Sequence, residues 1–399
     1  MRTMIDPDTA LALVLEHAHP LAQIEVPLHE SAGLILAASI HADNDYPPFD
    51  RTMMDGYAVR VADAGHTIPI RGEAAAGSSI TVSLEPGTAI EIMTGAPCPA
   101  GTELVVAKED VSVSGDAVSL PESIVYGQNI TRRGTECAEG REVLRRGDVV
   151  TPIALASIAT FGVHRVSVYP RPKVAIITTG DELVSSGEIP GPSQIRNSNG
   201  PMLAAMTAAL GISPTLVAHA KDRPDELRAA LQTADHADVV ILTGAVSAGK
   251  YDGVPDALAI FGATPVFHKV MQRPGKPIYF ATRGDQLIFG LPGNPLSCHL
   301  GYHRYVAPAI RARMHGVPVP PRAHGVLEDA YVMKGPRTVF QLGRAEDVDG
   351  TWRVRYFAGK GSADIYTGAT ANALLRFDPG QGMVQAGEAV DFEWLLLGR

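Results

Sequence analysis

The sequence predicts a multidomain α/β plus β protein, in which one central α/β domain is flanked by two β modules. Between residues 173 and 310, near-continuous apolar runs alternate with helix-forming segments, which is the pattern of a parallel, doubly wound sheet. Over residues 67–120 and 338–397, short β-forming runs are broken by turns that contain Gly or Pro. The 399 residues leave room for about two to four domains of roughly 100–200 residues each.

Two helices are expected before the central domain. The leucines and valine of residues 8–19 recur on one helical face. A second helix is predicted over 151–161, because Thr151 can cap it, Pro152 suits its first position and Gly162 follows its end. Because helix-forming sequence returns at 151–161 after the β module, we expect that module to be an insertion between two segments of one domain.

In the central domain, the apolar runs and the amphipathic segments between them predict alternating strands and helices. The strands are expected over residues 173–180, 214–219, 237–244 and 286–293, and the helices over 201–211, 224–234, 256–262 and 294–310. A Pro-rich segment at 315–325 is typical of a linker. Later β-forming runs occupy 338–343, 352–357, 373–377 and 390–397, with Asp349-Gly350 as a hairpin signal.

Composition excludes several classes of protein. The formal net charge is −9 and no block of consecutive Lys or Arg occurs, so a nucleic-acid partner is not expected. Cys98, Cys137 and Cys298 are isolated and offer neither a zinc spacing nor a disulfide framework. With no signal-peptide pattern and no apolar run of roughly 18 residues, we expect a soluble, cytoplasmic protein without a membrane partner.

Candidate ligand-binding residues follow three of the predicted strands. Open α/β sheets bind ligands beyond the carboxyl ends of their strands. Asp181 and Glu182 follow the first strand, a Gly-rich loop at 244–252 follows the third, and the segment 292–297 follows the last. The free N–H groups of such a loop or helix start attract phosphate oxygens. We therefore predict an anion site at this edge of the sheet.

The residues of this anion site have complementary roles. Gly244 and Gly249 let the backbone approach a ligand closely, and Ser247 can add a hydroxyl donor. Asn294 is a plausible N-cap of the last helix. The remaining candidates are Ser297 just inside that helix and the nearby cations Arg273 and Lys276.

The Gly-rich loop also resembles a nucleoside triphosphate P-loop. Residues 244–250 fit G-x-x-x-x-G-K, but Tyr251 stands where the loop needs a magnesium-binding hydroxyl. A phosphate-cradling loop of another kind is therefore favoured. Asp252 next to it either holds Mg²⁺ or water at a phosphate, or caps the following helix, and the residues leave both roles open.

Other polar residues carry the same ambiguity. Asp181 and Glu182 either cap a following helix or bind a polar ligand, and for Asp222 an N-cap is favoured. His299 and His303 are four residues apart, but they lack the Glu of H-E-x-x-H, so a place on the helix surface is favoured over zinc. The stretch at 45–60 is either a rigid turn leading into a strand or a set of carboxylates presented to a partner's cleft.

Eight motifs occur in a fixed order along the chain. They are DYPPFDRTMMDGYAV, IEIMTGAP, NITRRGTE, TTGDEL, IRNSNGPML, TGAVSAGKYDGV, RPGKPIYF and GLPGNPLS. Together they closely resemble the molybdopterin molybdenumtransferases, the bacterial MoeA and gephyrin E-domain family, over essentially the whole chain.

The resemblance implies an elongated homodimer of four-domain subunits, with the active cleft between the α/β domain of one subunit and the β insertion of the other. The implied domains are a discontinuous first domain at 1–43 and 140–170, an inserted β domain at 44–139, a molybdopterin-binding α/β domain at 171–318, and a C-terminal β barrel at 319–399.

The implied reaction inserts molybdate into adenylylated molybdopterin in a Mg²⁺-dependent step that releases AMP. Implied protein partners are molybdopterin adenylyltransferase and recipient molybdoenzymes. The catalytic residues carried over are Asp252, which also holds the metal, Glu182, Asp55 and Lys276. The substrate-binding residues are Thr94, Glu136, Asp181, Asp222, Gly244, Ser247, Gly249, Arg273, Pro277, Pro292, Asn294, Ser297, Arg337 and Ser362.

The chain departs from the family pattern at a few of these positions. Arg273 stands where a Lys is usual, Ala245 where a Gly is usual, and Glu136 where an Asp is usual. In the C-terminal module, Leu342 replaces a common Arg and Tyr366-Thr367 replaces a Ser pair. Two alternative functions are thus retained: a non-catalytic molybdopterin-binding scaffold, and a molybdopterin adenylyltransferase, whose fold matches the α/β domain alone.

Overall fold

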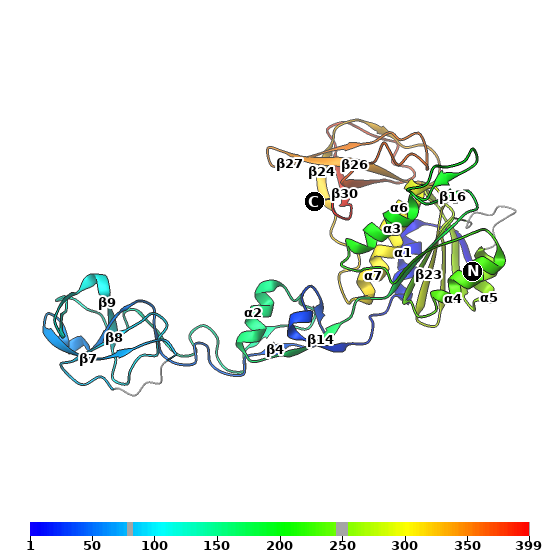
Figure 1. Ribbon diagram of the computed structural model, residues 1–399. Helices are drawn as coiled ribbons and strands as arrows, with labels where there is room; N and C mark the ends of the chain where they lie inside the picture. Colours follow the sequence, from blue (N-terminus) through cyan, green and yellow to red (C-terminus); the bar gives the residue numbers. More distant parts are fainter. Residues whose placement is uncertain (78–82, 245–253, 399) are drawn as a thin grey trace. The chain divides into compact units, whose positions relative to one another are not determined.

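The fold is that of a computed structural model, which describes residues 1–77, 83–244 and 254–398. The chain forms two compact units (Figure 1). Unit 1 comprises Met1–Glu25, Gly33–Ala37 and Ser167–Arg399, and unit 2 comprises Val26–Ala32 and Ala38–Val166. Among the described residues, no helix is both long and apolar enough to cross a membrane.

Unit 1 is built on a sheet that shows seven strands in its described part, in the order β1-β20-β22-β23-β19-β15-β18. Their bounds are β1 Arg2–Ile5, β20 Thr264–Val270, β22 Tyr279–Arg283, β23 Gln286–Leu291, β19 Val239–Thr243, β15 Val174–Thr179 and β18 Leu216–Ala220. The four predicted strands β18, β15, β19 and β23 are parallel neighbours, which confirms the central α/β domain.

The other half of this sheet corrects the expectation of an all-parallel sheet. β22 runs antiparallel to both β20 and β23, and β1 pairs parallel with β20. The sequence pattern did not reveal β20, because the strand is only partly buried and mixes polar with apolar residues. A continuous apolar run is expected only for strands covered on both faces.

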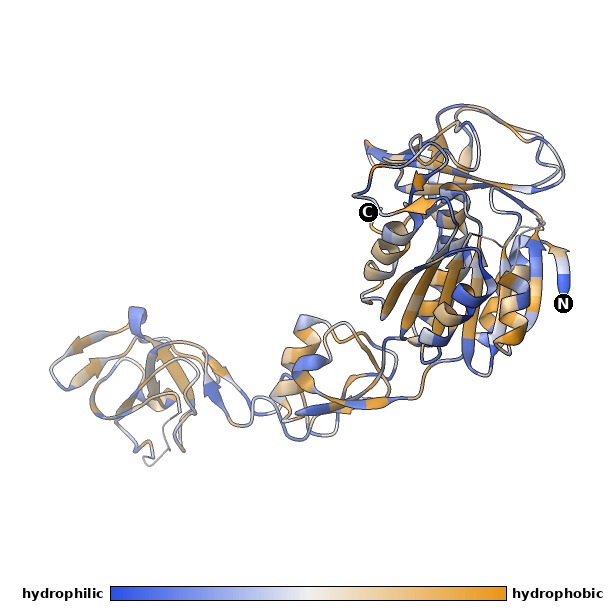
Figure 2. Cartoon of the chain, turned by 45° about the vertical axis from the view of Figure 1, so that its right-hand side comes forward, coloured by the Kyte–Doolittle hydropathy of each residue, from blue (hydrophilic) through white to orange (hydrophobic). Residues whose placement is uncertain are grey.

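Helices cover both faces of the sheet. One face packs against α1 Pro7–His17, α3 Asn199–Ala208, α6 Pro295–Gly301 and α7 Ala307–Arg313, with a π turn at Tyr302–Val306 between the last two, and the other against α4 Pro224–Thr233 and α5 Val254–Ile260. Along β15, Val174 and Ile176 face the first group of helices, whereas Ala175 and Ile177 face the second. The strands accordingly show as hydrophobic in Figure 2.

The expected N-terminal helix is α1, and it packs within unit 1. Its N-cap Asp6 accepts hydrogen bonds from the N–H groups of Asp8 and Thr9 at 3.0 and 2.9 Å, so the helix itself is confirmed. Its buried residues, Ala10 among them, belong to the core under the α/β sheet. By its contacts, segment Met1–Glu25 belongs to unit 1, and the expected domain boundaries stay a prediction. An apolar helix face does not reveal from sequence alone which apolar surface will cover it.

Unit 2 contains the predicted β module. Its described strands form the sheet β10-β11-β7-β8-β6-β9, with bounds β6 Gly56–Val59, β7 Thr67–Ala74, β8 Ala89–Ile92, β9 Leu104–Ala107, β10 Ser112–Ser114 and β11 Ala117–Ser119. Gly56 is required at its place in β6, because a Cβ there would lie 2.0 Å from the carbonyl oxygen of Val106. The predicted helix is α2 Pro152–Thr160, and the Thr151 hydroxyl accepts from the N–H of Ala154 at 3.2 Å.

The C-terminal module is a closed barrel of five strands within the described residues, because β26 pairs with both β27 and β28. The strands are β24 Ala323–Leu327, β26 Thr338–Val348, β27 Thr351–Tyr356, β28 Ala373–Phe377 and β30 Ala389–Trp394. Asp349 and Gly350 turn the β26–β27 hairpin with φ of 52° and 78°, as their sequence predicted.

Shorter strands complete the described structure. They are β2 Ile24–Pro27, β3 Ile35–Leu36, β4 Ile40–His41, β5 Arg51–Thr52, β12 Ile130–Thr131, β13 Glu142–Leu144, β14 Arg165–Tyr169, β16 Leu183–Val184, β17 Ile195–Arg196, β21 Gln272–Arg273, β25 Tyr331–Val332 and β29 Met383–Val384. One of them is important for the site: β21 pairs parallel with β26 and so joins the α/β domain to the barrel.

Candidate active site

Two adjoining pockets lie in unit 1 where β15, β19 and β23 end. The larger pocket, of about 880 Å³, is lined by Glu182, Asp222 and Gly244 among others. The second, called here the basic pocket, measures about 390 Å³ and is lined by Arg273, Lys276 and Arg337 among others. The two share Pro277, Pro292 and Asn294. The structure thus brings together, in one region of unit 1, residues that lie far apart in the sequence.

The larger pocket has an acidic wall. Burial, and then the negative charges of Glu182 and Asp181, raise the pKa of Asp222 above its ordinary value. The N-cap of α4 is Arg223, so the cap role favoured for Asp222 is wrong. The segment after Asp181 and Glu182 is the short strand β16 and not a helix. Glu182 and Asp222, which line this pocket, remain candidates for ligand binding, whereas Asp181 is not part of its described lining.

A buried asparagine ties together the floor of the larger pocket. The Asn199 amide donates to the Thr243 hydroxyl at 3.0 Å and to the carbonyl of Gly293 at 2.7 Å. The Thr243 hydroxyl donates in turn to the carbonyl of Pro292 at 3.0 Å. Sequence reasoning missed Asn199 and Thr243, although Asn199 lies within the IRNSNGPML motif. Only the folded chain shows that they connect the ends of neighbouring strands.

Gly244 stands at the end of β19, where no side chain fits. A Cβ at this position would lie 2.3 Å from the Thr179 hydroxyl oxygen and 2.5 Å from its carbonyl oxygen. Its φ of 117° also lies in a region that other residues rarely adopt. Three further predicted site residues, Ser247, Gly249 and Asp252, lie outside the described residues, as does Ala245.

The basic pocket gathers cations from both the α/β domain and the barrel. Arg273 ends β21, Lys276 lies in the turn that follows, and Arg337 precedes β26. Among the described lining residues the only carboxylate is Asp364, whose pKa is lowered to about 2 by hydrogen bonds from the N–H of Lys360 and from Thr367. A pocket of this composition attracts anions.

Two polar side chains close the basic pocket between domains. The Asn294 amide donates to the Ser362 hydroxyl at 2.8 Å and makes no side-chain cap to α6. Asn294 is thus the N-cap residue by position, but its side chain serves the barrel loop. Ser297 is almost fully buried in the first turn of α6, at 3% exposure, and still lines the pocket.

The remaining predicted site residues lie in unit 2. The carboxylate of Asp55 accepts from the N–H and the hydroxyl of Thr94, both at 2.7 Å, and these bonds lower the pKa of Asp55. Glu136 pairs with Arg51 at 2.7 Å. All three predicted residues are exposed. None of the three belongs to the described lining of either pocket.

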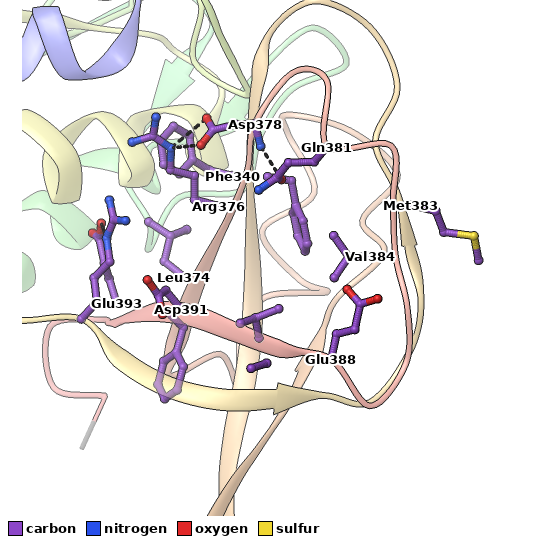
Figure 3. A pocket seen from close by; sticks show the side chains of 15 residues that line it. Phe340, Leu374, Arg376, Asp378, Gln381, Met383, Val384, Glu388, Asp391 and Glu393 are labelled. Carbon is purple, nitrogen blue, oxygen red and sulfur yellow. Dashed lines mark hydrogen bonds and ion pairs between the residues drawn. The ribbon is translucent and has the colours of Figure 1, made fainter.

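A further pocket, of about 470 Å³, opens in the wall of the barrel (Figure 3). It is lined by a charged network that sequence reasoning did not find. Arg376 binds Asp378 at 2.9 Å and Asp8 at 2.6 Å, while Glu393 binds Arg304 at 2.5 Å. These ion pairs join the barrel to α1 and to the π turn.

His303 belongs to the same network, at 3.4 Å from Glu393 and 7% exposed, so its expected place on the helix surface is wrong. Helix α6 and its continuation are covered by the sheet on one side and by the barrel on the other. No group of three or more His, Cys, Asp or Glu residues in the described part of the chain could hold a metal ion.

Comparisons with known proteins match the chain from end to end. Residues 5–162 match the "MoeA N-terminal region (domain I and II)", residues 175–312 the "Probable molybdopterin binding domain", and residues 324–395 the "MoeA C-terminal region (domain IV)". A molybdopterin molybdenumtransferase of Staphylococcus aureus is 31% identical over 402 residues, covering 98% of this chain and 95% of that protein.

The chain belongs to the MoeA family of molybdopterin molybdenumtransferases. Molybdopterin molybdenumtransferase 2 of Mycobacterium tuberculosis, a further family member, is 34% identical over 94% of this chain and 95% of its own length. The crystal structure of the molybdopterin biosynthesis MoeA protein from Pyrococcus horikoshii has a TM-score of 0.83 at 26% identity, and the match covers 98% of this chain and 99% of that one. The resemblance inferred from the eight motifs is confirmed.

Three barrel residues that the sequence analysis singled out as departures line the two pockets. Leu342 and Thr367 line the basic pocket, and Tyr366 lines the larger one. These three barrel positions thus lie in the walls of the two pockets.

Proposed function

We propose that this chain inserts molybdenum from molybdate into adenylylated molybdopterin and releases AMP, as a step of molybdenum cofactor biosynthesis. The observation that carries the proposal is the pair of adjoining pockets, one with an acidic wall and one basic, which share Pro277, Pro292 and Asn294. A substrate lying across the shared wall would have one end in each pocket.

The basic pocket is the proposed molybdate site. Molybdate is a tetrahedral dianion, and the guanidinium groups of Arg273 and Arg337 and the ammonium of Lys276 are suited to bind its oxygens with charge-assisted hydrogen bonds. Ser362, held by Asn294, supplies a hydroxyl in the same pocket. The larger pocket would hold the pterin and its adenylylated phosphate, next to Gly244 in its lining.

The acidic wall of the larger pocket fits a magnesium ion held with the substrate. Burial and then the like charges of Glu182 and Asp181 raise the pKa of Asp222, and a divalent cation would relieve that repulsion. Mg²⁺ commonly binds one or two carboxylates together with water and substrate phosphates, so no larger preformed cluster is needed. Asp222 and Glu182, with Asp252 from the adjacent loop, are the proposed holders. The ion would neutralise charge on the departing phosphate.

We also propose that the active protein is a homodimer in the cytoplasm. Asp55, Thr94 and Glu136 are exposed and belong to the lining of neither described pocket, which supports a role toward a second subunit. All three cysteines are free thiols, as in proteins of a reducing compartment.

The proposed function predicts molybdate-dependent release of AMP from adenylylated molybdopterin in the presence of Mg²⁺. We expect Glu182→Gln and Asp222→Asn each to lower the rate by about 100-fold or more, the usual cost of losing a charge that acts in the transition state. Measuring AMP by chromatography, with and without Mg²⁺, tests this. Glu188→Gln, a nearby exposed residue outside both pockets, is the control.

Binding of the pterin substrate without AMP release by the wild-type protein would contradict the transferase assignment and favour the non-catalytic scaffold.

The proposal that two subunits share each active site has its own test. When Asp55→Ala and Lys276→Ala proteins, each with strongly reduced activity alone, are mixed and allowed to exchange subunits, activity should rise to about a quarter of the wild-type value, because half the dimers are mixed and each has one intact site.

A further inference from the structure

One fully buried amide lies beneath the basic pocket and contacts the turn that carries its cations. Gln272 in β21 has 0% exposure and directly precedes Arg273. Its side-chain nitrogen donates to the carbonyl of Pro274 at 3.2 Å, and its backbone carbonyl accepts from the Arg337 guanidinium at 3.5 Å. A single residue thus contacts both the turn after β21 and the barrel arginine.

The turn packs directly on this amide. Gly275 has a φ of 83°, and a Cβ there would lie 3.0 Å from the Gln272 amide nitrogen. Arg273 and Lys276 themselves are exposed, long and flexible side chains. Their reach into the pocket therefore depends on where the turn places their backbone.

A buried tyrosine fixes which way the amide points. The Tyr305 hydroxyl donates to the Gln272 side-chain oxygen at 2.5 Å, and Tyr305 is fully buried. Burial also raises the pKa of Tyr305, so the hydroxyl keeps the proton that it donates. Without this donor, nothing fixes which way the amide points. In the rotated position its oxygen would face the carbonyl oxygen of Pro274, and because two acceptors cannot bond to each other, the hydrogen bond to the turn would be lost.

We propose that Tyr305 and Gln272 are positioning residues for oxyanion binding: the hydroxyl orients the amide, and the amide holds the turn that places Arg273 and Lys276 in the basic pocket. The inference rests on the proposed function of that pocket. It makes Tyr305, which lines neither described pocket, a determinant of affinity for molybdate.

The test compares two tyrosines of the same helical segment. Tyr305→Phe removes one hydroxyl and keeps the ring. Tyr302→Phe is the matched control, because Tyr302 is also fully buried and its hydroxyl also has one buried partner, Thr207 at 3.0 Å. Equilibrium binding of radiolabelled molybdate gives Kd for each full-length protein. The Michaelis constants for molybdate and for adenylylated molybdopterin are measured in parallel.

We expect Tyr305→Phe to weaken molybdate binding about five- to tenfold, because the lost buried hydrogen bond contributes roughly 1 kcal/mol to holding the amide in its orientation. The KM for adenylylated molybdopterin should stay within about twofold, and Tyr302→Phe should leave molybdate binding unchanged. Gln272→Met should weaken molybdate binding at least as much, and adding Tyr305→Phe to it should cost nothing further, because the two residues act as one unit.

Equal molybdate affinity in wild type and Tyr305→Phe would overturn the inference, and so would equal losses in the two tyrosine variants, which would mark a general packing effect. If the wild-type protein bound no molybdate, the proposed role of the basic pocket would fail and the inference with it. If instead the wild type binds molybdate and Tyr305→Phe binds it equally well, the role of the basic pocket stands and only the further inference fails.

Discussion

Lys276→Ala and Arg337→Ala are each expected to lower kcat/KM for molybdate by about 10- to 100-fold, which corresponds to the roughly 1.5–3 kcal/mol of one charge-assisted hydrogen bond. Both side chains line the basic pocket, and its only carboxylate among the described residues is already bound within its own loop. Removing either cation therefore lowers the positive charge that a dianion meets. Steady-state kinetics over a molybdate titration measures the effect.

The control is Arg355→Ala, an exposed arginine of the same barrel that lines neither described pocket; its kcat/KM should match the wild type. Arg337→Lys refines the result, because it keeps the charge and loses the planar fork of donors. We expect its loss to be intermediate. Equal losses for molybdate and for adenylylated molybdopterin in Lys276→Ala would contradict a dedicated molybdate pocket.

The sequence anticipated the parts of this site that have strong local signals. Glycines and polar residues after apolar strands located Gly244, Asn294 and the Asp181-Glu182 pair, because parallel strands end at one edge of a sheet. The cations Arg273 and Lys276 followed from the same reasoning. Local patterns were thus sufficient to outline an anion site before any resemblance was used.

What the sequence did not reveal depends on contacts between distant segments. Gln272 and Tyr305 are 33 positions apart, and each looks like an ordinary residue of a strand or a helix. Asn199 gave no sign that it would connect the ends of two strands, β19 and β23. Helix α1 showed an apolar face, but the sequence did not show that this face packs in the core under the α/β sheet. Which distant segments contact each other can be seen only in the folded structure.

The largest effect on stability is expected for Glu393→Gln. The Glu393 carboxylate is 14% exposed and holds Arg304, which is 3% exposed, at 2.5 Å. Glutamine keeps the shape but leaves a buried guanidinium short of its counterion, and removal of one partner of a buried pair costs about 3–5 kcal/mol. Because Asp8 still lies 3.9 Å from Arg304, we expect the lower end of that range. Urea unfolding measures the change.

Glu346→Gln is the matched control on the same barrel. Its carboxylate pairs with Arg344 at 2.6 Å but is 57% exposed, so solvent screening should limit the loss to about 1 kcal/mol or less. The apolar double variant Arg304→Met with Glu393→Leu should recover much of the stability, since it leaves no buried charge uncompensated. If Glu393→Gln cost no more than Glu346→Gln, the buried network could not be what fixes the barrel to the π turn.

The same carboxylate gives the network a defined dependence on pH. Burial alone would raise the pKa of Glu393, but the hydrogen bond from His303 and the charge of Arg304 outweigh it and lower the pKa from 4.5 to about 2. A carboxylate whose folded pKa is depressed contributes stability that is complete above its unfolded pKa and is lost as pH falls toward its folded pKa. The gap in unfolding free energy between wild type and Glu393→Gln should therefore be constant near neutral pH and shrink between about pH 4.5 and pH 2.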